Sequence, residues 1–75
     1  MNVYDPAYQE FIARLRRARG EKGLTQVQAA KLLKKPHSYI SKCELGERRV
    51  DFVEALKFAQ IYGKSVLFFS KNLHD

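Results

Sequence analysis

The chain has 75 residues, one cysteine and a net charge of +6. This length allows a single domain with a modest core and excludes a deep catalytic cleft beside it. A lone cysteine excludes an intramolecular disulfide and is typical of a reducing compartment. The N-terminus has no basic start or apolar run, and the longest apolar string, Val66 to Phe69, is far too short to cross a bilayer. We therefore expect a cytoplasmic protein without membrane contact.

The positive charge is concentrated in one part of the chain. Residues 14–49 contain eleven Lys and Arg against three acids, a local balance of +8. Residues 1–13 carry a charge of −2, and residues 50–75 are balanced. A surface that faces phosphate groups requires such clustering. A solvated basic face without a partner is the alternative that charge alone leaves open.

The first predicted helix spans about Pro6 to Lys22. Proline is accepted in a first turn, Asp5 can cap it, and Gly23 is a natural end. Its apolar residues recur at the spacing of one buried face. They are Tyr8, Phe11, Ile12, Leu15 and Ala18.

Residues 25–45 predict two short helices joined by a tight turn. Thr25 is a good N-cap for the first helix, Pro36 is pre-set to begin the second, and Gly46 ends it. The apolar face of the first helix is Ala29, Ala30, Leu32 and Leu33. The apolar positions of the second are Tyr39, Ile40, Cys43 and Leu45. Its opposite face holds His37, Ser38, Ser41 and Lys42.

Two further helices complete the prediction. One runs from its cap at Asp51 to Tyr62, and the other begins after Ser65 and takes in residues 66–69. The expected buried residues of the longer one are Phe52, Ala55, Leu56, Ala59 and Tyr62. No segment alternates long enough to form a strand. The predicted class is all-α, a compact five-helix domain over residues 1–75 with a helix-turn-helix motif at about residues 25–45.

This two-helix layout within a basic chain resembles the Cro/repressor-type, or XRE, helix-turn-helix family. The resemblance covers roughly residues 8–69, nearly the whole chain. The residues that carry it are Leu15, Arg19, Gly23, Leu24, Thr25, Gln26, Ala30, Leu33, Ser38, Tyr39, Ile40, Ser41, Lys42, Glu44, Gly46, Glu47, Arg48 and Arg49. It implies a lambda-repressor-like DNA-binding domain, without a cofactor, whose second motif helix enters the major groove of double-stranded DNA.

Three residues between the motif helices depart from the commonest family pattern. Lys34 stands where the family usually has Gly, Lys35 where it has an apolar residue, and Pro36 where it has a Ser or Thr cap. A non-Gly residue held at positive φ is strained, so we expect an altered and more basic turn. A subgroup with Pro here and a GERR-type loop is most similar, given the segment GERRVDFVEAL at residues 46–56.

The resemblance implies that the first residues of the second motif helix meet base edges. The matching positions are His37, Ser38 and Lys42. Lysine can donate to guanine O6 and N7, serine can donate or accept, and neutral histidine can donate to a guanine acceptor. For His37, an exposed helix start without a DNA contact is the alternative.

A second set of residues is expected to contact the DNA backbone. These are Thr25, Gln26, Arg19, Tyr39, Ser41, Arg48 and Arg49. Thr25 and Gln26 open the first motif helix, where free N–H groups and the helix dipole favour an anion. The resemblance implies that Gln26 bonds a phosphate from there. For Tyr39, a packing role is the alternative.

The resemblance also places an ion pair between Arg19 and Glu44, which joins the first helix to the end of the recognition helix. A partly buried, bidentate pair holds that helix in orientation and leaves spare guanidinium N–H groups near a phosphate. The alternative is a surface pair worth no more than ~1 kcal/mol.

No constellation in the sequence supports an enzyme or a metal site. The soft metal ligands are His37, Cys43 and His74, and no two have the spacing of a zinc site. The lone cysteine fits a small core residue. A Gly-rich phosphate loop and a Ser-His-Asp order are both absent from the sequence.

We therefore expect a sequence-specific DNA-binding transcriptional regulator, a repressor that binds an inverted-repeat operator as a homodimer. One recognition helix reads few base pairs, relatives pair through their C-terminal helices, and residues 66–69 offer more apolar surface than a small core absorbs. The expected dimer interface is Val66, Leu67, Phe68 and Phe69. Two alternatives remain, a protein-interaction module such as an antitoxin or adaptor, and a controller protein of a restriction-modification system.

Overall fold

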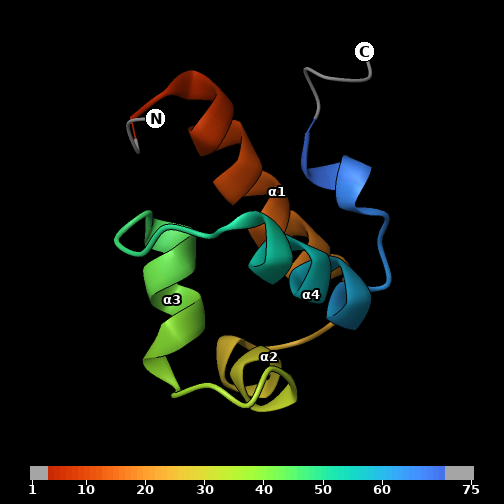
Figure 1. Ribbon diagram of the computed structural model, residues 1–75. Coiled ribbons are helices and arrows are strands. Elements are labelled where there is room, and N and C mark those ends of the chain that lie inside the picture. The colour runs from red at the N-terminus through yellow and green to blue at the C-terminus, as the bar shows by residue number, and fades with distance from the viewer. Residues whose placement is uncertain (1–3, 71–75) are drawn as a thin grey trace.

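The computed structural model describes residues 4–70, which form four α-helices and one 3-10 turn and contain no strand (Figure 1). The elements are α1 (Pro6–Lys22), α2 (Gln26–Leu32), α3 (Ser38–Leu45), α4 (Phe52–Tyr62) and η1 (Val66–Phe69). The all-helical class is confirmed, but the prediction of a fifth α-helix is wrong. Four residues are too few for an i→i−4 ladder, so η1 closes a tighter turn. The Phe68 N–H donates to the Ser65 carbonyl at 2.9 Å.

The predicted helix caps are confirmed. Asp5 accepts a backbone N–H at the start of α1, at 2.8 Å. Thr25 and Asp51 form reciprocal capping boxes with the side chains of Gln28 and Glu54, so two otherwise unpaired N–H groups are satisfied at each helix start. Local side-chain chemistry therefore determines where α1, α2 and α4 begin.

α1 is the central element of the fold, since α3, α4 and η1 all pack on it and α2 packs on α3. Figure 1 shows α3 and η1 at opposite sides of the molecule. Within residues 4–70 no helix is long and apolar enough to span a membrane. His74, one of the soft metal ligands considered above, lies outside the described residues.

The buried face of α1 agrees with the predicted one. Its buried residues are Tyr8, Ile12, Leu15 and Ala18, and Phe11 packs half-buried against the core. On α2, Ala29 and Ala30 are fully buried because small side chains let α3 approach closely. Leu32 was expected on the same face but is 56% exposed, and Leu45 of α3 is exposed as well.

The buried face of α4 agrees with the prediction at Ala55, Ala59 and Tyr62 and differs at three other positions. Phe52 and Leu56 are 69% and 42% exposed, whereas Phe58 was not expected in the core and is 1% exposed. The row that packs inward is Ala55, Phe58, Ala59 and Tyr62. Periodicity allows either Phe52 and Leu56 or Phe58 to be buried beside the residues that both rows share. Packing against α1 and η1 selects Phe58.

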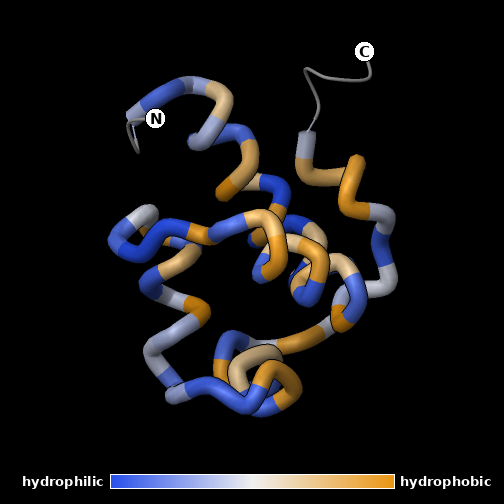
Figure 2. The backbone as a smooth tube through the Cα atoms, in the orientation of Figure 1, coloured by the Kyte–Doolittle hydropathy of each residue, from blue (hydrophilic) through white to orange (hydrophobic). Residues whose placement is uncertain are grey.

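The turn between α2 and α3 contains a left-handed residue that is not glycine. Lys34 has φ 58°, the one positive φ among the non-glycine residues described. Its neighbour Lys35 donates its N–H to the Ala30 carbonyl at 2.9 Å, which closes the end of α2. Figure 2 shows hydrophilic segments at both ends of α3, in this turn and in the loop that follows α3.

Replacing Lys34 by glycine should stabilise the protein. A left-handed backbone disfavours an L-residue by about 1–2 kcal/mol, whereas glycine adopts it freely but loses about 0.4–1 kcal/mol through the unfolded chain. We expect Lys34→Gly to raise the free energy of unfolding by about 1 kcal/mol, measured by urea titration followed by circular dichroism. Lys34→Ala removes the same charge but keeps the strained φ, so an equal gain for both variants would contradict the backbone explanation.

Candidate nucleic-acid interface

α3 divides its side chains between two faces. Its buried residues are Tyr39, Ile40, Cys43 and Glu44. The opposite face, with its N-cap, carries His37, Ser38 and Lys42, all exposed, which we call the exposed stripe. A rotation of 100° per residue produces this division. The structure thus brings the three predicted base-contact residues together on one solvent-facing surface.

Glu44 is a buried carboxylate that holds α3 against α1. Its side chain is 3% exposed. Arg19 donates from Nε to Oε2 at 2.7 Å and from Nη2 to Oε1 at 3.0 Å, a bidentate pair. The third nitrogen of Arg19, Nη1, donates to the Leu24 carbonyl at 3.0 Å. Because the pair is buried, removing one partner leaves an uncompensated charge and costs about 3–5 kcal/mol.

Two further side chains reach Glu44, and sequence reasoning missed both. Gln26 donates from Nε2 to Oε1 at 3.1 Å, and Arg16 places Nε 3.8 Å from the same oxygen. These contacts join residues that are distant in sequence, so no local pattern indicates them. The bond to Glu44 uses one of the two N–H donors of the Gln26 amide, so the second donor and the backbone N–H are left for the predicted phosphate contact.

Tyr39 connects α3 to the start of α4. Its hydroxyl donates to Glu54 Oε2 at 2.8 Å, and Arg48 pairs with the same carboxylate at 2.9 Å. Burial raises the pKa of Tyr39, and the bond to Glu54 raises it further, so the hydroxyl remains a donor. Tyr39 is itself buried and stacks on Phe58, which gives it a packing role.

Desolvation by itself would raise the pKa of Glu54. The hydrogen bonds that its carboxylate accepts from the Asp51 N–H, Arg48 and Tyr39 outweigh that effect and hold the pKa at about 2, below its usual value of 4.5. The spacing of a capping box, an acid three residues after Asp51, is a sequence signal for the first of these bonds. The other two bonds depend on tertiary packing.

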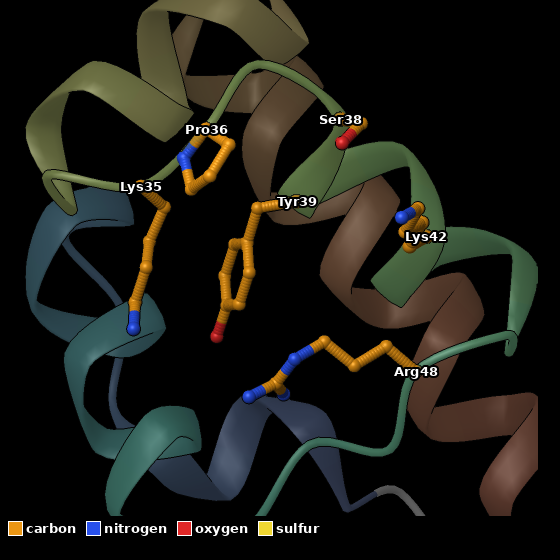
Figure 3. A pocket seen from close by; sticks show the side chains of 6 residues that line it. All are labelled: Lys35, Pro36, Ser38, Tyr39, Lys42 and Arg48. Atoms are coloured by element: carbon orange, nitrogen blue, oxygen red, sulfur yellow. The ribbon is translucent and has the colours of Figure 1, made fainter.

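A shallow hollow of about 270 Å³ lies beside the exposed stripe (Figure 3). It is lined by Lys35, Pro36, Ser38, Tyr39, Lys42 and Arg48. Figure 3 shows Lys35 and Arg48 reaching towards the hydroxyl end of the Tyr39 ring, Lys35 from the turn before α3 and Arg48 from the loop after it. Both cations lie over that ring, at 5.3 Å for Lys35 Nζ and 4.9 Å for Arg48 Cζ.

The other residues expected at the DNA backbone already make contacts within the protein. Thr25 Oγ1 accepts the Gln28 N–H at 3.1 Å, and Ser41 Oγ donates to the Ser38 carbonyl at 3.1 Å. The Arg49 guanidinium lies 5.5 Å from the centre of the Tyr8 ring. Arg49 and Thr25 are exposed and Ser41 is half-buried, so all three remain near the surface.

The four residues predicted for the dimer interface differ in exposure. Phe69 is buried in the domain core, and Val66 and Phe68 are half-buried against it. Leu67 is 56% exposed. The guanidinium of Arg14 and the ammonium of Lys64 both lie over the Phe68 ring. Of this set, Leu67 is the side chain that points most towards solvent.

Two short helices joined by a tight turn, with the second presenting a polar face flanked by cations, define a helix-turn-helix DNA-binding module. The chain belongs to the helix-turn-helix domain family, whose model matches residues 10–66. This membership confirms the family predicted from the sequence and agrees with its Cro/repressor, or XRE, type. A comparison with curated proteins gave no significant match.

The low pKa of Glu54 predicts that its contribution to stability depends on pH. A carboxylate whose pKa is depressed on folding stabilises the folded state above its unfolded pKa, and this is lost as the pH falls through the folded pKa. We expect Glu54→Gln to lower the free energy of unfolding by about 2 kcal/mol at pH 7. The gap to the unaltered protein should close between about pH 4.5 and 2.

Urea unfolding at several pH values measures this gap. Glu47→Gln is the matched control, because it removes the same charge from an exposed glutamate in the loop between α3 and α4. A gap for Glu54→Gln that stays constant from pH 7 to pH 2, or one that Glu47→Gln reproduces, would contradict the assignment to the Tyr39 and Arg48 bonds.

Proposed function

We propose that the protein is a sequence-specific transcriptional regulator of the cytoplasm, a repressor that binds an inverted-repeat operator as a homodimer. The observation that carries this proposal is the exposed stripe of α3 with cations at both ends of the helix. Within residues 4–70, the ion pairs of 4.0 Å or less involve neither Lys42 nor Lys35. Unpaired cations beside a polar helix face fit a partner with phosphates on its rim and hydrogen-bonding bases between them.

Within this proposal the exposed stripe reads bases. Lys42 lies one helical turn after Ser38, so both side chains can reach into one groove from the same face. The lysine donates to guanine, the serine hydroxyl donates or accepts, and His37 adds a donor at the helix start. Thr25, Gln26 and the arginines of the loop after α3 position the domain on the sugar-phosphate backbone.

A homodimer is proposed because α3 has only eight residues and so reads few base pairs. Leu67 is an exposed apolar side chain of η1, and η1 lies on the opposite side of the molecule from α3 (Figure 1), so a second copy packed on it leaves α3 open to DNA. On an inverted-repeat site the dimer must hold its two recognition helices about one DNA turn apart, ~34 Å. In each subunit the contacts of Glu44 fix the orientation of α3, so the two recognition helices have the same orientation within their domains.

Selection of a binding site from random DNA, followed by titration at several salt concentrations, tests DNA recognition. Each phosphate contact contributes about −0.9 to the slope of log affinity against log salt, so the slope should be steep. Lys42→Ala should cost ~1–3 kcal/mol on the selected sequence and much less on random DNA. Arg49→Ala should weaken binding to both.

Two outcomes would count against this function. A flat salt dependence removes DNA as the partner, because phosphate neutralisation releases counterions. An equal loss on selected and random DNA for Lys42→Ala removes this lysine from the base-reading set and leaves it a backbone contact.

Sedimentation measures the proposed dimer. The unaltered protein should form a dimer at tens of micromolar, and Leu67→Glu should shift it to a folded monomer because a charge enters an apolar contact. Leu32→Glu is a matched control, since Leu32 of α2 has the same 56% exposure. A monomer in solution that is still a monomer on the selected site would exclude the symmetric-dimer arrangement.

A further inference from the structure

The hollow beside Tyr39 holds more positive charge than its internal contacts neutralise. Arg48 is paired with Glu54 at 2.9 Å. Lys35 and Lys42, which line the same hollow, take no part in the ion pairs formed within residues 4–70. Two ammonium groups outside these ion pairs and one guanidinium therefore line the same small space. Like charges held close together repel, and an anion between them relieves the repulsion.

The size of the hollow suits a single anionic group. At about 270 Å³ it lies below the roughly 300–1,000 Å³ of pockets that enclose small-molecule ligands. Its donors come from three directions, with Lys35 before α3, Ser38 on its first turn and Arg48 after it. The Tyr39 hydroxyl is not among them, because it donates to Glu54 at 2.8 Å. Donors spread around an open space match the oxygens of a phosphate.

The hollow is continuous with the exposed stripe. Ser38 and Lys42 belong to both, so a ligand that places base edges against the exposed stripe has its nearest backbone strand at the hollow. A partner that supplies bases and phosphates side by side is a nucleic acid, whereas a free phosphate supplies the anion only. The adjacency therefore favours DNA over a small anionic effector.

We propose that this hollow binds one phosphodiester group of the DNA backbone, with Lys35 and Arg48 as its principal ligands. The inference rests on the proposed function and adds Lys35 to the DNA-contacting residues, a position where the family pattern has an apolar side chain. Tyr39 serves as the platform that keeps both cations in place through its ring.

Neutralising single phosphates tests the inference. A set of selected operator duplexes, each with one phosphate replaced by an uncharged methylphosphonate, is titrated with the unaltered protein and with Lys35→Met. Methionine keeps an unbranched apolar side chain over the Tyr39 ring but removes the ammonium. The unaltered protein should lose about tenfold in affinity at one position in each half-site, and Lys35→Met should show no loss at that position.

Matched variants separate this effect from a general loss of charge. Lys57→Met removes an exposed lysine of α4 outside the hollow and should leave the position-specific loss intact. Lys35→Arg keeps the charge and should keep the loss as well. Lys35→Met should also reduce the salt slope by about 1 for each bound subunit, to the same extent on selected and random DNA.

Three outcomes would overturn the inference. If Lys35→Met lost as much affinity as the unaltered protein at every neutralised phosphate, Lys35 would not contact the DNA backbone. If Lys35→Met and Lys57→Met changed the sensitivity to neutralised phosphates equally, the effect would come from the total charge of the protein and not from the hollow. Saturable binding of inorganic phosphate to the free protein, unchanged by DNA, would assign the hollow to a free anion. In each case steep, sequence-selective binding by the unaltered protein leaves the proposed function standing, whereas its absence removes both.

Discussion

The buried carboxylate of Glu44 is the interaction on which the rest of the structure depends. It accepts hydrogen bonds from Arg19 on α1 and Gln26 at the start of α2, while sitting on α3 itself. An ionised carboxylate without partners is strongly disfavoured in a protein interior, so the three helices must assemble together for any of them to be stable there. The orientation of α3 is consequently a property of the whole domain rather than of the turn before it.

This constraint also determines which face of α3 meets solvent. Because Glu44, Ile40 and Cys43 face the core, the helical rotation per residue directs the exposed stripe towards solvent. The unusual turn residues do not alter that outcome, because Lys34 adopts a left-handed backbone that glycine takes more readily. The backbone strain is confined to Lys34, and the packing of α3 is retained. A substitution in the turn or on the exposed stripe leaves the contacts of Glu44 in place, whereas a substitution of Glu44 removes them.

The features that sequence predicted well are those decided by neighbouring residues. Capping at Asp5, Thr25 and Asp51, and glycine at the ends of α1 and α3, follow from local backbone and side-chain chemistry. The inward row of α4 was predicted in part: Ala55, Ala59 and Tyr62 were expected there, whereas the burial of Phe58 in place of Phe52 and Leu56 depends on tertiary packing. The bonds from Gln26 to Glu44 and from Tyr39 to Glu54 likewise join distant segments and leave no periodic signal.

The pairing of Arg48 with Glu54 and Tyr39 affects the entropy of association. A mobile arginine side chain loses up to about 1.5–2 kcal/mol of rotamer freedom when a ligand immobilises it. Arg48 has already lost much of that freedom in the free protein, since its guanidinium is bound to a carboxylate and stacked on a ring. An anion that binds Arg48 therefore does not have to order this side chain, because folding has already ordered it. Lys42 has no such contact within residues 4–70 and must still be ordered at the moment of binding.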